Sequence, residues 1–452
     1  MPEATSAGKA APGNRSPESY LPRLGLFSGT MMVVGGIIGS GIFLNPAIVA
    51  QRVGTVTWTL AAWVLGGVVA LIGAMVFAEL GARRPVAGGG YVYLRECFGK
   101  LPAFLYAWTL LLVIATGAIA AVAVTFAGYT AALLGLEPQA AVAIAVGAIL
   151  TLSAVNYLGV KPGAITQNIF TLLKLCALAL LIVVGLAGNP MPAAPPEPAT
   201  PNLALAIAAA LVPVLFAFGG WQQTNFIAEE LRDPARNLPR ALLAGVSVVV
   251  AVYLLANVVY VRTLGISGLA RSDAPAADVM GALLGDTGRT IIAAGIAVST
   301  FGFLNLVILV SPRVYRAMAR DGLFFSRLAR LHPRYRTPAG AIVVQGGWAI
   351  LLTLTGGYGE LLDYVVFGDW IFFGATAATL FLYRSRARHG TETDVLRFRM
   401  PGYPITPLIF ICAAVYVVLG SVLSNPGNAL KGTALMALGV PVYWYWRKKQ
   451  PT

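Results

Sequence analysis

The sequence predicts an all-α membrane protein that crosses the bilayer many times, and two observations support this fold class. Of the 452 residues, 58% are hydrophobic and only 11% are charged, whereas a soluble domain has roughly 25% charged residues. The hydrophobic residues fall in stretches of about 18 to 25 residues, long enough to cross the hydrocarbon core of a bilayer. With a mean hydropathy of +0.76, such a chain would expose too much apolar surface to water, which excludes a cytosolic enzyme.

Apolar windows predict about twelve spans, each expected to be a helix. Several exceed the minimum length for a span of about 20 residues, which predicts tilted or interrupted helices. The tail over residues 1–22 is rich in Ala, Gly, Pro and Ser and lacks the apolar core of a cleaved signal peptide, so we expect a disordered cytoplasmic lead-in. The expected spans are 24–50, 56–82, 101–134, 139–158, 165–187, 203–228, 239–262, 277–311, 339–356, 361–383, 404–423 and 429–446.

The basic residues predict the orientation, because short cytoplasmic loops are enriched in Lys and Arg. With a cytoplasmic N-terminus, 26 of the 32 Lys and Arg fall inside, 5 fall outside and only Lys174 lies within a span. We therefore expect both termini in the cytoplasm, an even number of spans, and a multi-pass protein of the cell (plasma or inner) membrane. The net charge of +14 is spread over these loops, so a nucleic-acid partner is not expected, whereas membrane lipid is.

The first span carries an unusual concentration of glycine. Residues 35–43 read GGIIGSGIF, and glycine in a helix interior costs about 1 kcal/mol relative to alanine. Close packing through small residues is one interpretation. The other is an unwound segment, in which Ser40, Gly41 and Ile42 present free backbone N–H groups at the start of a second half-helix. Such a helix start favours a carboxylate.

The sixth span repeats this pattern, because Gly219 and Gly220 interrupt the apolar run FAFGGW. Its freed carbonyl groups could receive an ammonium group. Breaks in spans one and six are five helices apart, as an inverted repeat of five plus five helices requires, with substrate bound at the repeat interface. The predicted organisation is a tail (1–22), a first repeat (23–187), an external Pro-rich loop (188–202), a second repeat (203–384), a cytoplasmic loop (385–403), two peripheral helices (404–447) and a cytoplasmic C-terminus (448–452).

Five motifs together resemble the amino acid–polyamine–organocation superfamily, and within it the L-type amino-acid transporter branch. The resemblance extends from about Leu24 to the last span and implies a leucine-transporter-type fold with two peripheral helices. The motifs are, in order, GIIGSGIF, FAELGARRPVAGGGYVYLRECFG, QNIFTLLK, FAFGGWQQTNFIAEELRDPARNLPRA and SPRVYRAMARDG.

The resemblance also implies a binding site for a small-molecule substrate, an α-amino acid. Backbone N–H groups at Ser40 and Gly41 would hold its carboxylate, and Phe216 would also act as the gate toward the outside. Backbone recognition is physically sensible, because all α-amino acids share these two groups while their side chains differ. Carbonyl groups would hold the ammonium group at Ile37, Phe216, Ala217 and Gly219.

Lys174 is the one basic residue inside a confident span, and a charge there costs about 2.5–3.5 kcal/mol on insertion scales. It could reach back to the cytoplasmic surface. The resemblance implies instead that it occupies the site where relatives bind sodium and contacts the unwound first helix. Ser299 and Asn305 could line the same region or serve helix packing. Asp369, in the tenth span, could be a polar anchor near the outer surface, the reading we favour, or a proton carrier.

The expected function is sodium-independent secondary transport of neutral L-amino acids by alternating access, with exchange favoured over proton-coupled symport. A receptor or channel on the same fold is the alternative of another class. No enzyme, cofactor or metal is expected, because no cluster of His, Asp or Glu converges in the spans. Relatives that take dibasic substrates carry an aspartate at the position of Gly219, so arginine and lysine should be poor substrates. Eukaryotic relatives bind a glycoprotein heavy chain through a cysteine after the third helix; residues 136–139 contain none, so no such subunit is expected.

Overall fold

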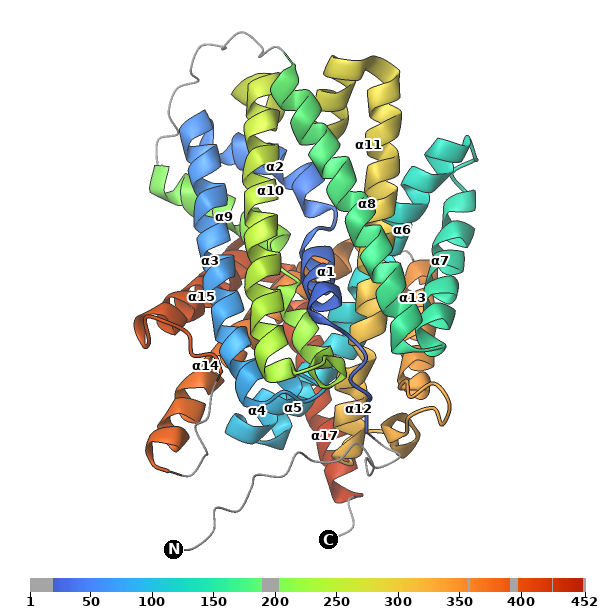
Figure 1. Cartoon of the computed structure of the whole chain (residues 1–452), viewed down its shortest axis with the longest axis vertical. Coiled ribbons are helices and arrows are strands. Elements are labelled where there is room, and N and C mark those ends of the chain that lie inside the picture. Colours follow the sequence, from blue (N-terminus) through green and yellow to red (C-terminus); the bar gives the residue numbers. More distant parts are fainter. Residues whose placement is uncertain (1–18, 189–202, 356–357, 391–396, 425, 450–452) are drawn as a thin grey trace, which may run out of the picture.

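The computed structural model describes residues 19–188, 203–355, 358–390, 397–424 and 426–449. These residues form a bundle of helices, and no strand occurs among them apart from a single bridge between Leu24 and Leu231. The helix α1 begins and α17 ends at the same end of the bundle, which is the lower end in Figure 1. An even number of crossings requires this placement.

The first half of the bundle contains two short helices joined at a break, four expected spans' worth of longer helix, and the short helix α4 between the second and third spans. The second span is one straight helix, and the third is built from three consecutive helical segments, one of which is a π-helix. The elements are α1 (Leu26–Ile37), α2 (Gly41–Val53), α3 (Val56–Arg83), α4 (Gly90–Phe98), α5 (Lys100–Thr109), η1 (Leu110–Ile114), α6 (Ala115–Leu134), α7 (Ala140–Tyr157) and α8 (Val160–Ala187).

The second half also begins with a broken element. Gly265 and Gly285 have non-helical backbone angles, so α10 and α11 each consist of two helices that meet at a kink. The elements are α9 (Leu203–Ala217), the 3₁₀-helix η2 (Trp221–Glu230), α10 (Pro234–Ala270), α11 (Pro275–Val310), α12 (Pro312–Arg320), the 3₁₀-helix η3 (Ser326–Ala329), α13 (Ala339–Thr355), α14 (Tyr358–Arg388), α15 (Ile405–Ser424), α16 (Pro426–Ala437) and α17 (Gly439–Lys448).

In the described part of the chain, eight helices are long and apolar enough to cross a bilayer, or nine when α1 and α2 count as one bent span. The predicted polytopic all-α class is therefore confirmed. The other three expected spans correspond to α13, to α14 and to the pair α16–α17. Of these, α13 has 17 residues, and α16 and α17 have 12 and 10.

Several expected boundaries are wrong, and the seventh span, α10, extends beyond the expected 239–262 at both ends. The fifth span begins at Val160 rather than at 165, so Lys161 belongs to the first turn of α8. Residues 19–22 of the tail are also ordered, because the Tyr20 ring is buried beneath the guanidinium of Arg316, 4.7 Å from the ring centre. The other tail residues, 1–18, and most of the Pro-rich loop lie outside the described residues.

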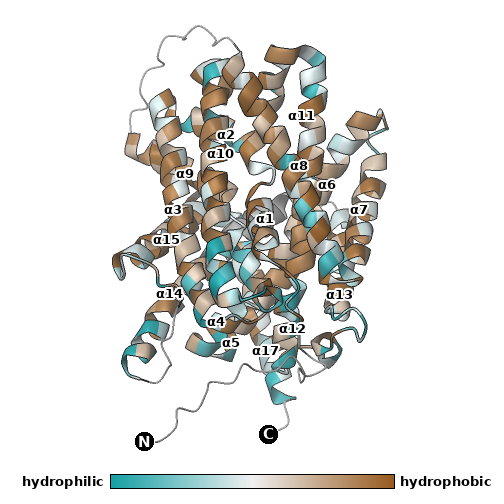
Figure 2. Cartoon of the chain, in the orientation of Figure 1, coloured by the Kyte–Doolittle hydropathy of each residue, from teal (hydrophilic) through white to brown (hydrophobic). Residues whose placement is uncertain are grey.

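Hydrophobic residues cover the middle and upper parts of the bundle, and hydrophilic residues gather at the lower end around α4, α12 and α17 (Figure 2). The broken element α1–α2 lies in the interior and packs against α8, α9, α10 and α11. Both breaks therefore lie inside the bundle, where unpaired backbone groups can be tolerated only if they line a cavity.

Candidate functional site

The first break separates α1 from α2 over residues Ile38, Gly39 and Ser40, and the two helices are bent by 42°. The N–H of Gly39 donates to the Ile37 carbonyl at 2.9 Å, which closes a tight turn. Among the described residues, no acceptor takes the N–H groups of Ser40, Gly41 or Ile42. The start of α2 therefore offers unpaired donors and the positive end of a helix dipole.

The second break follows Ala217, where α9 ends and a turn leads into η2. A 3₁₀-helix of ten residues is unusually long, and such stretches often mark a hinge. The two breaks touch through Gly36 and Gly220: a Cβ at Gly220 would lie 2.1 Å from the Gly36 carbonyl oxygen, and its φ is +110°. Only glycine permits this backbone crossing, which explains the glycine pairs seen in both spans.

A cavity of about 310 Å³ opens between the two breaks and the helices that face them. The predicted residues Ile37, Ser40 and Gly41 line it from the first break. Its remaining predicted residues come from the second break: Phe216, Ala217 and Gly219. Ile42 does not line the cavity, because its side chain is fully buried in the core. The Phe216 side chain is 38% exposed, which agrees with a position at the mouth of the cavity.

Three of the four predicted ammonium-binding carbonyls, those of Ile37, Phe216 and Ala217, already have partners within the protein. The hydroxyl of Tyr253, on α10, lies 3.1 Å from the Ile37 carbonyl oxygen and 3.3 Å from that of Ala217, and can donate to either. The N–H of Gly219 donates to the Phe216 carbonyl. A carbonyl has two lone pairs and can accept a second donor. Tyr253 therefore links both breaks, a role that sequence reasoning missed because a lone Tyr in an apolar span carries no local signal.

Lys174 reaches the first break from α8. Its Nζ donates to the carbonyl oxygens of Ile38 at 2.6 Å and Gly35 at 3.1 Å, and the side chain is fully buried rather than turned toward the surface. Ser299 Oγ lies 3.3 Å from the carbonyl oxygens of Ile38 and Gly39. Gly302 makes room for the lysine, since a Cβ there would lie 3.3 Å from Lys174 Cε. An ammonium group thus occupies a cluster of backbone oxygens and one hydroxyl.

Asn305 lies in a separate polar network rather than at the break. Its amide nitrogen donates to the Gln167 side chain and to the Gly163 carbonyl, each at 3.0 Å, and its oxygen accepts from Asn156. The network joins α7, α8 and α11 in the interior. Of the two interpretations of Asn305, helix packing is therefore the one that its contacts favour.

The opposite wall of the cavity is formed by η1 and α14. The π-helix η1 contributes Leu110 and Ile114 to this wall. A side chain from another helix also bonds to the η1 backbone: Trp348 Nε1 donates to the Leu112 carbonyl at 3.0 Å. A short π-helix inside an α-helix is frequent at functional sites. From α14, Asp369 and the aromatic pair Trp370 and Phe373 also line the cavity. The expectation that Asp369 anchors the outer surface is therefore wrong.

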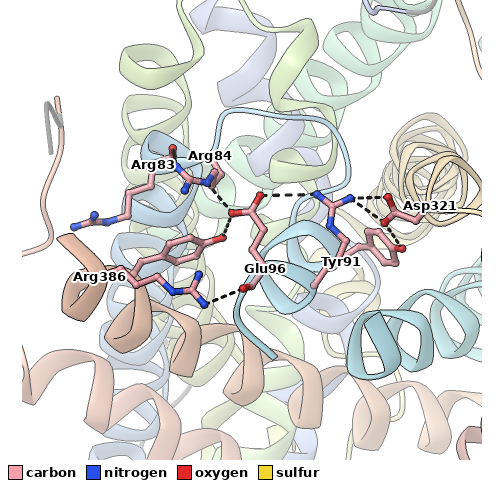
Figure 3. A network of polar contacts seen from close by, with 8 residues as sticks. Arg83, Arg84, Tyr91, Glu96, Asp321 and Arg386 are labelled. Atoms are coloured by element: carbon pink, nitrogen blue, oxygen red, sulfur yellow. Dashed lines mark hydrogen bonds and ion pairs between the residues drawn. The ribbon is translucent and has the colours of Figure 1, made fainter. Parts of the chain in front are cut away.

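Below the cavity, at the end that holds α4 and α12, ion pairs connect the two halves of the bundle (Figure 3). Arg95 Nη1 lies 2.8 Å from both carboxylate oxygens of Asp321, and the Tyr91 hydroxyl donates to the same carboxylate at 2.7 Å. Glu96 accepts from Arg84 at 2.7 Å and from the Tyr383 hydroxyl at 2.9 Å. These contacts join α4 of the first half to α12 and α14 of the second.

A buried ion pair lies within the second half, and a second carboxylate joins the two halves. Arg313 Nε, at the start of α12, donates to the Glu230 carboxylate at 2.9 Å, and both side chains are almost fully buried. Glu79 at the end of α3 accepts from Arg83 and Arg384 and from the backbone N–H of Met400. At the lower end, the contacts of Glu79 with Arg384 and Met400 and those of α4 with Asp321 and Tyr383 therefore connect the two halves through charged groups.

These features can be compared with known proteins. A family profile described as amino acid permease matches residues 24–444, which is most of the chain. The chain belongs to the amino acid permease family. Curated relatives agree with this assignment. The permease is 34% identical over 436 residues to the b(0,+)-type amino acid transporter 1 of Mus musculus, covering 94% of this chain and 88% of the relative.

A second relative is the large neutral amino acids transporter small subunit 2 of Homo sapiens, with 34% identity over 475 residues, 99% of this chain and 84% of the relative. The human b(0,+)-type amino acid transporter 1 is 35% identical over 416 residues, 90% of this chain and 84% of the relative. The superfamily and the L-type branch inferred from the five sequence motifs are confirmed.

Proposed function

We propose that this permease is a sodium-independent secondary transporter that exchanges neutral L-amino acids across the cell membrane, with both termini in the cytoplasm. The observation that carries the proposal is the pairing of two complementary backbone breaks around one cavity. One break offers the unpaired N–H groups of Ser40 and Gly41, and the other offers carbonyl oxygens around Ala217 and Gly219.

This arrangement suits a zwitterion. A carboxylate is stabilised at the start of α2 by the free donors and the helix dipole. An ammonium group is stabilised by the carbonyl oxygens of the second break, at the end of α9. Neither contact uses a charged side chain, so any α-amino acid can be held in the same way, and the side chain is left to meet the η1–α14 wall.

Sodium independence rests on Lys174. A bound sodium ion beside a break holds carbonyl and hydroxyl oxygens together, and the Lys174 ammonium contacts such a set, from Gly35 and Ile38, with Ser299 beside it. A fixed positive charge therefore holds the break without an ion gradient. The permease works as an exchanger if it converts between outward-facing and inward-facing states more readily with substrate bound than with the site empty.

The test is transport by the purified chain in liposomes. Liposomes preloaded with unlabelled leucine should accumulate labelled leucine by counterflow, equally well in sodium and in potassium or choline buffer. Empty liposomes should take up little. Uptake that requires external sodium would refute sodium independence, and uptake into empty liposomes driven by a pH gradient would replace exchange by proton symport.

The names of the relatives bear on substrate and partner. One is named for large neutral amino acids and is called a small subunit, which supports neutral substrates and raises the question of a partner. The loop between α6 and α7 contains no cysteine, and the three cysteines of the chain are Cys97 on α4, Cys176 on α8 and Cys412 on α15. We therefore propose that the permease works without a disulfide-linked heavy chain.

A further inference from the structure

Asp369 is a carboxylate without a protein partner in the wall of the substrate cavity. Among the residues that the structure describes, none donates a hydrogen bond to it or forms an ion pair with it. Next to it, α14 packs closely on η1 at Gly368, where a Cβ would lie 3.3 Å from Ile114. Asp369 lines the cavity together with Trp370 and Phe373.

The cavity wall around it contains no positive charge. None of the described residues that line the cavity is Lys, Arg or His, and Lys174 lies behind the first break with its Nζ bonded to backbone. A second acceptor is also free: Gln223 Oε1 is buried, lines the same cavity and has no partner among the described residues. Two acceptors in the cavity wall thus have no cationic side chain beside them, and no donor is bonded to either among the described residues.

An unmatched acceptor in an apolar wall is costly, because a buried polar group without a partner loses about 1–3 kcal/mol of solvation. A ligand that donates a hydrogen bond to it recovers this loss. A site built around such an acceptor therefore discriminates strongly against the isosteric ligand that lacks the donor. A cationic side chain would also satisfy Asp369, but its ammonium or guanidinium group loses far more solvation than a hydroxyl or amide does.

We propose that Asp369 recognises the side chain of the substrate, and that the preferred neutral substrates carry a hydroxyl or amide group that donates a hydrogen bond to it. The proposal rests on the proposed function, since it assumes that an amino acid occupies this cavity with its backbone groups at the two breaks. Threonine, serine and glutamine are among the natural amino acids of this class.

The experiment compares isosteric substrates as competitors of labelled alanine, whose methyl side chain provides no donor for Asp369. Threonine and valine differ by one hydroxyl, and glutamine and methionine are matched in length. In the wild type, threonine should compete at least tenfold better than valine, the ratio that about 1.4 kcal/mol produces. In Asp369→Leu the ratio should fall to about one, whereas in Asp369→Asn, which keeps an acceptor oxygen, part of it should remain.

Asp286→Asn is the matched control, because Asp286 is exposed, lies on α11 and pairs only with Arg289 at 3.0 Å. It should leave both ratios unchanged. Alanine uptake by each variant reports folding and keeps the two proposals separate. If no amino acid enters, the transport function fails and this inference fails with it. If alanine enters but threonine and valine compete equally in the wild type, only the role of Asp369 is wrong.

Two other outcomes would also overturn it. If arginine or lysine competes better than glutamine in the wild type and loses that advantage in Asp369→Asn, Asp369 is the partner of a cationic side chain. Alternatively, Asp369→Asn could abolish a response to a pH gradient while keeping the threonine preference; Asp369 would then carry a proton rather than select the substrate.

Discussion

Replacing Lys174 by methionine tests whether the ammonium group holds the first break in its binding geometry. Methionine has a similar length, so the space between α8 and α11 stays filled. The substitution removes two hydrogen bonds to the carbonyls of Gly35 and Ile38. Each hydrogen bond to a charged group contributes about 1.5–3 kcal/mol. It also removes a buried charge whose desolvation costs several kcal/mol.

These two effects nearly cancel in the stability of the fold, so the variant should fold and insert normally. The two effects do not cancel in substrate binding. Without the ammonium group, the first break loses the contacts that fix its carbonyls. The N–H groups of Ser40 and Gly41 are then no longer held in the orientation that binds the carboxylate. If only about 1.4 kcal/mol of the lost interaction differs between the bound and empty states, affinity falls tenfold. We therefore expect Lys174→Met to reduce uptake at low substrate concentration by tenfold or more.

The assay is counterflow of labelled leucine into liposomes, with protein amount and gel-filtration profile measured for each variant. Lys161→Met is the matched control, since Lys161 lies on the same helix, is exposed, and makes no contact with either break. It should transport like the wild type. Normal uptake and normal substrate affinity in a folded Lys174→Met variant would refute the argument.

Three further predictions concern other parts of the site. Gly41→Val should abolish substrate binding while the protein stays folded, because a Cβ at Gly41 would lie 3.0 Å from Ala217 Cβ and separate the breaks. Gly347→Val is the control, since a Cβ at Gly347 meets nothing within 4 Å. Normal substrate binding by a folded Gly41→Val variant would contradict the proposed site. The purified chain alone should transport in liposomes; inactivity until a second subunit is added would show that a partner is needed. Arg95→Gln removes the ion pair with Asp321. Maleimide added from the α4–α12 side should then label a cysteine that replaces Ser311, which lines the cavity, faster than in the protein with Arg95. An unchanged labelling rate would mean that this ion pair does not restrict access from that end.

The two breaks were predictable because their cause is local. Glycines clustered in an apolar span either allow close helix packing or unwind the helix, and the structure places the breaks where Gly35–Gly41 and Gly219–Gly220 predict them. Lys174 could also be singled out from the local sequence, because it is a charged residue inside an apolar span and such a charge needs a partner. Its contact with Ile38, however, entered the prediction only through the resemblance to a family.

The features that escaped prediction depend on contacts between distant segments. Tyr253 contacts both breaks because α10 passes beside them, and nothing in its neighbouring sequence distinguishes it from a tyrosine in the core. The π-helix η1 has an ordinary apolar sequence, LLLVI. Asp369 was visible as a charge in a span, but its position along the span was compatible with the outer surface. Its place in the cavity wall depends on how α14 packs against η1, which are far apart in the sequence.

Taken together, the contacts divide recognition between two kinds of atom. In the proposed site, the groups that all amino acids share would meet backbone atoms at the breaks, where Gly36 and Gly220 lie in contact and Tyr253 and Lys174 bond to the carbonyls. The group that differs among amino acids would meet side chains of η1 and α14, which belong to different halves of the bundle. A substitution in this wall can therefore change which side chain is accepted without disturbing the breaks. Substitutions at the breaks should instead affect every substrate alike, because the backbone contacts are common to all of them.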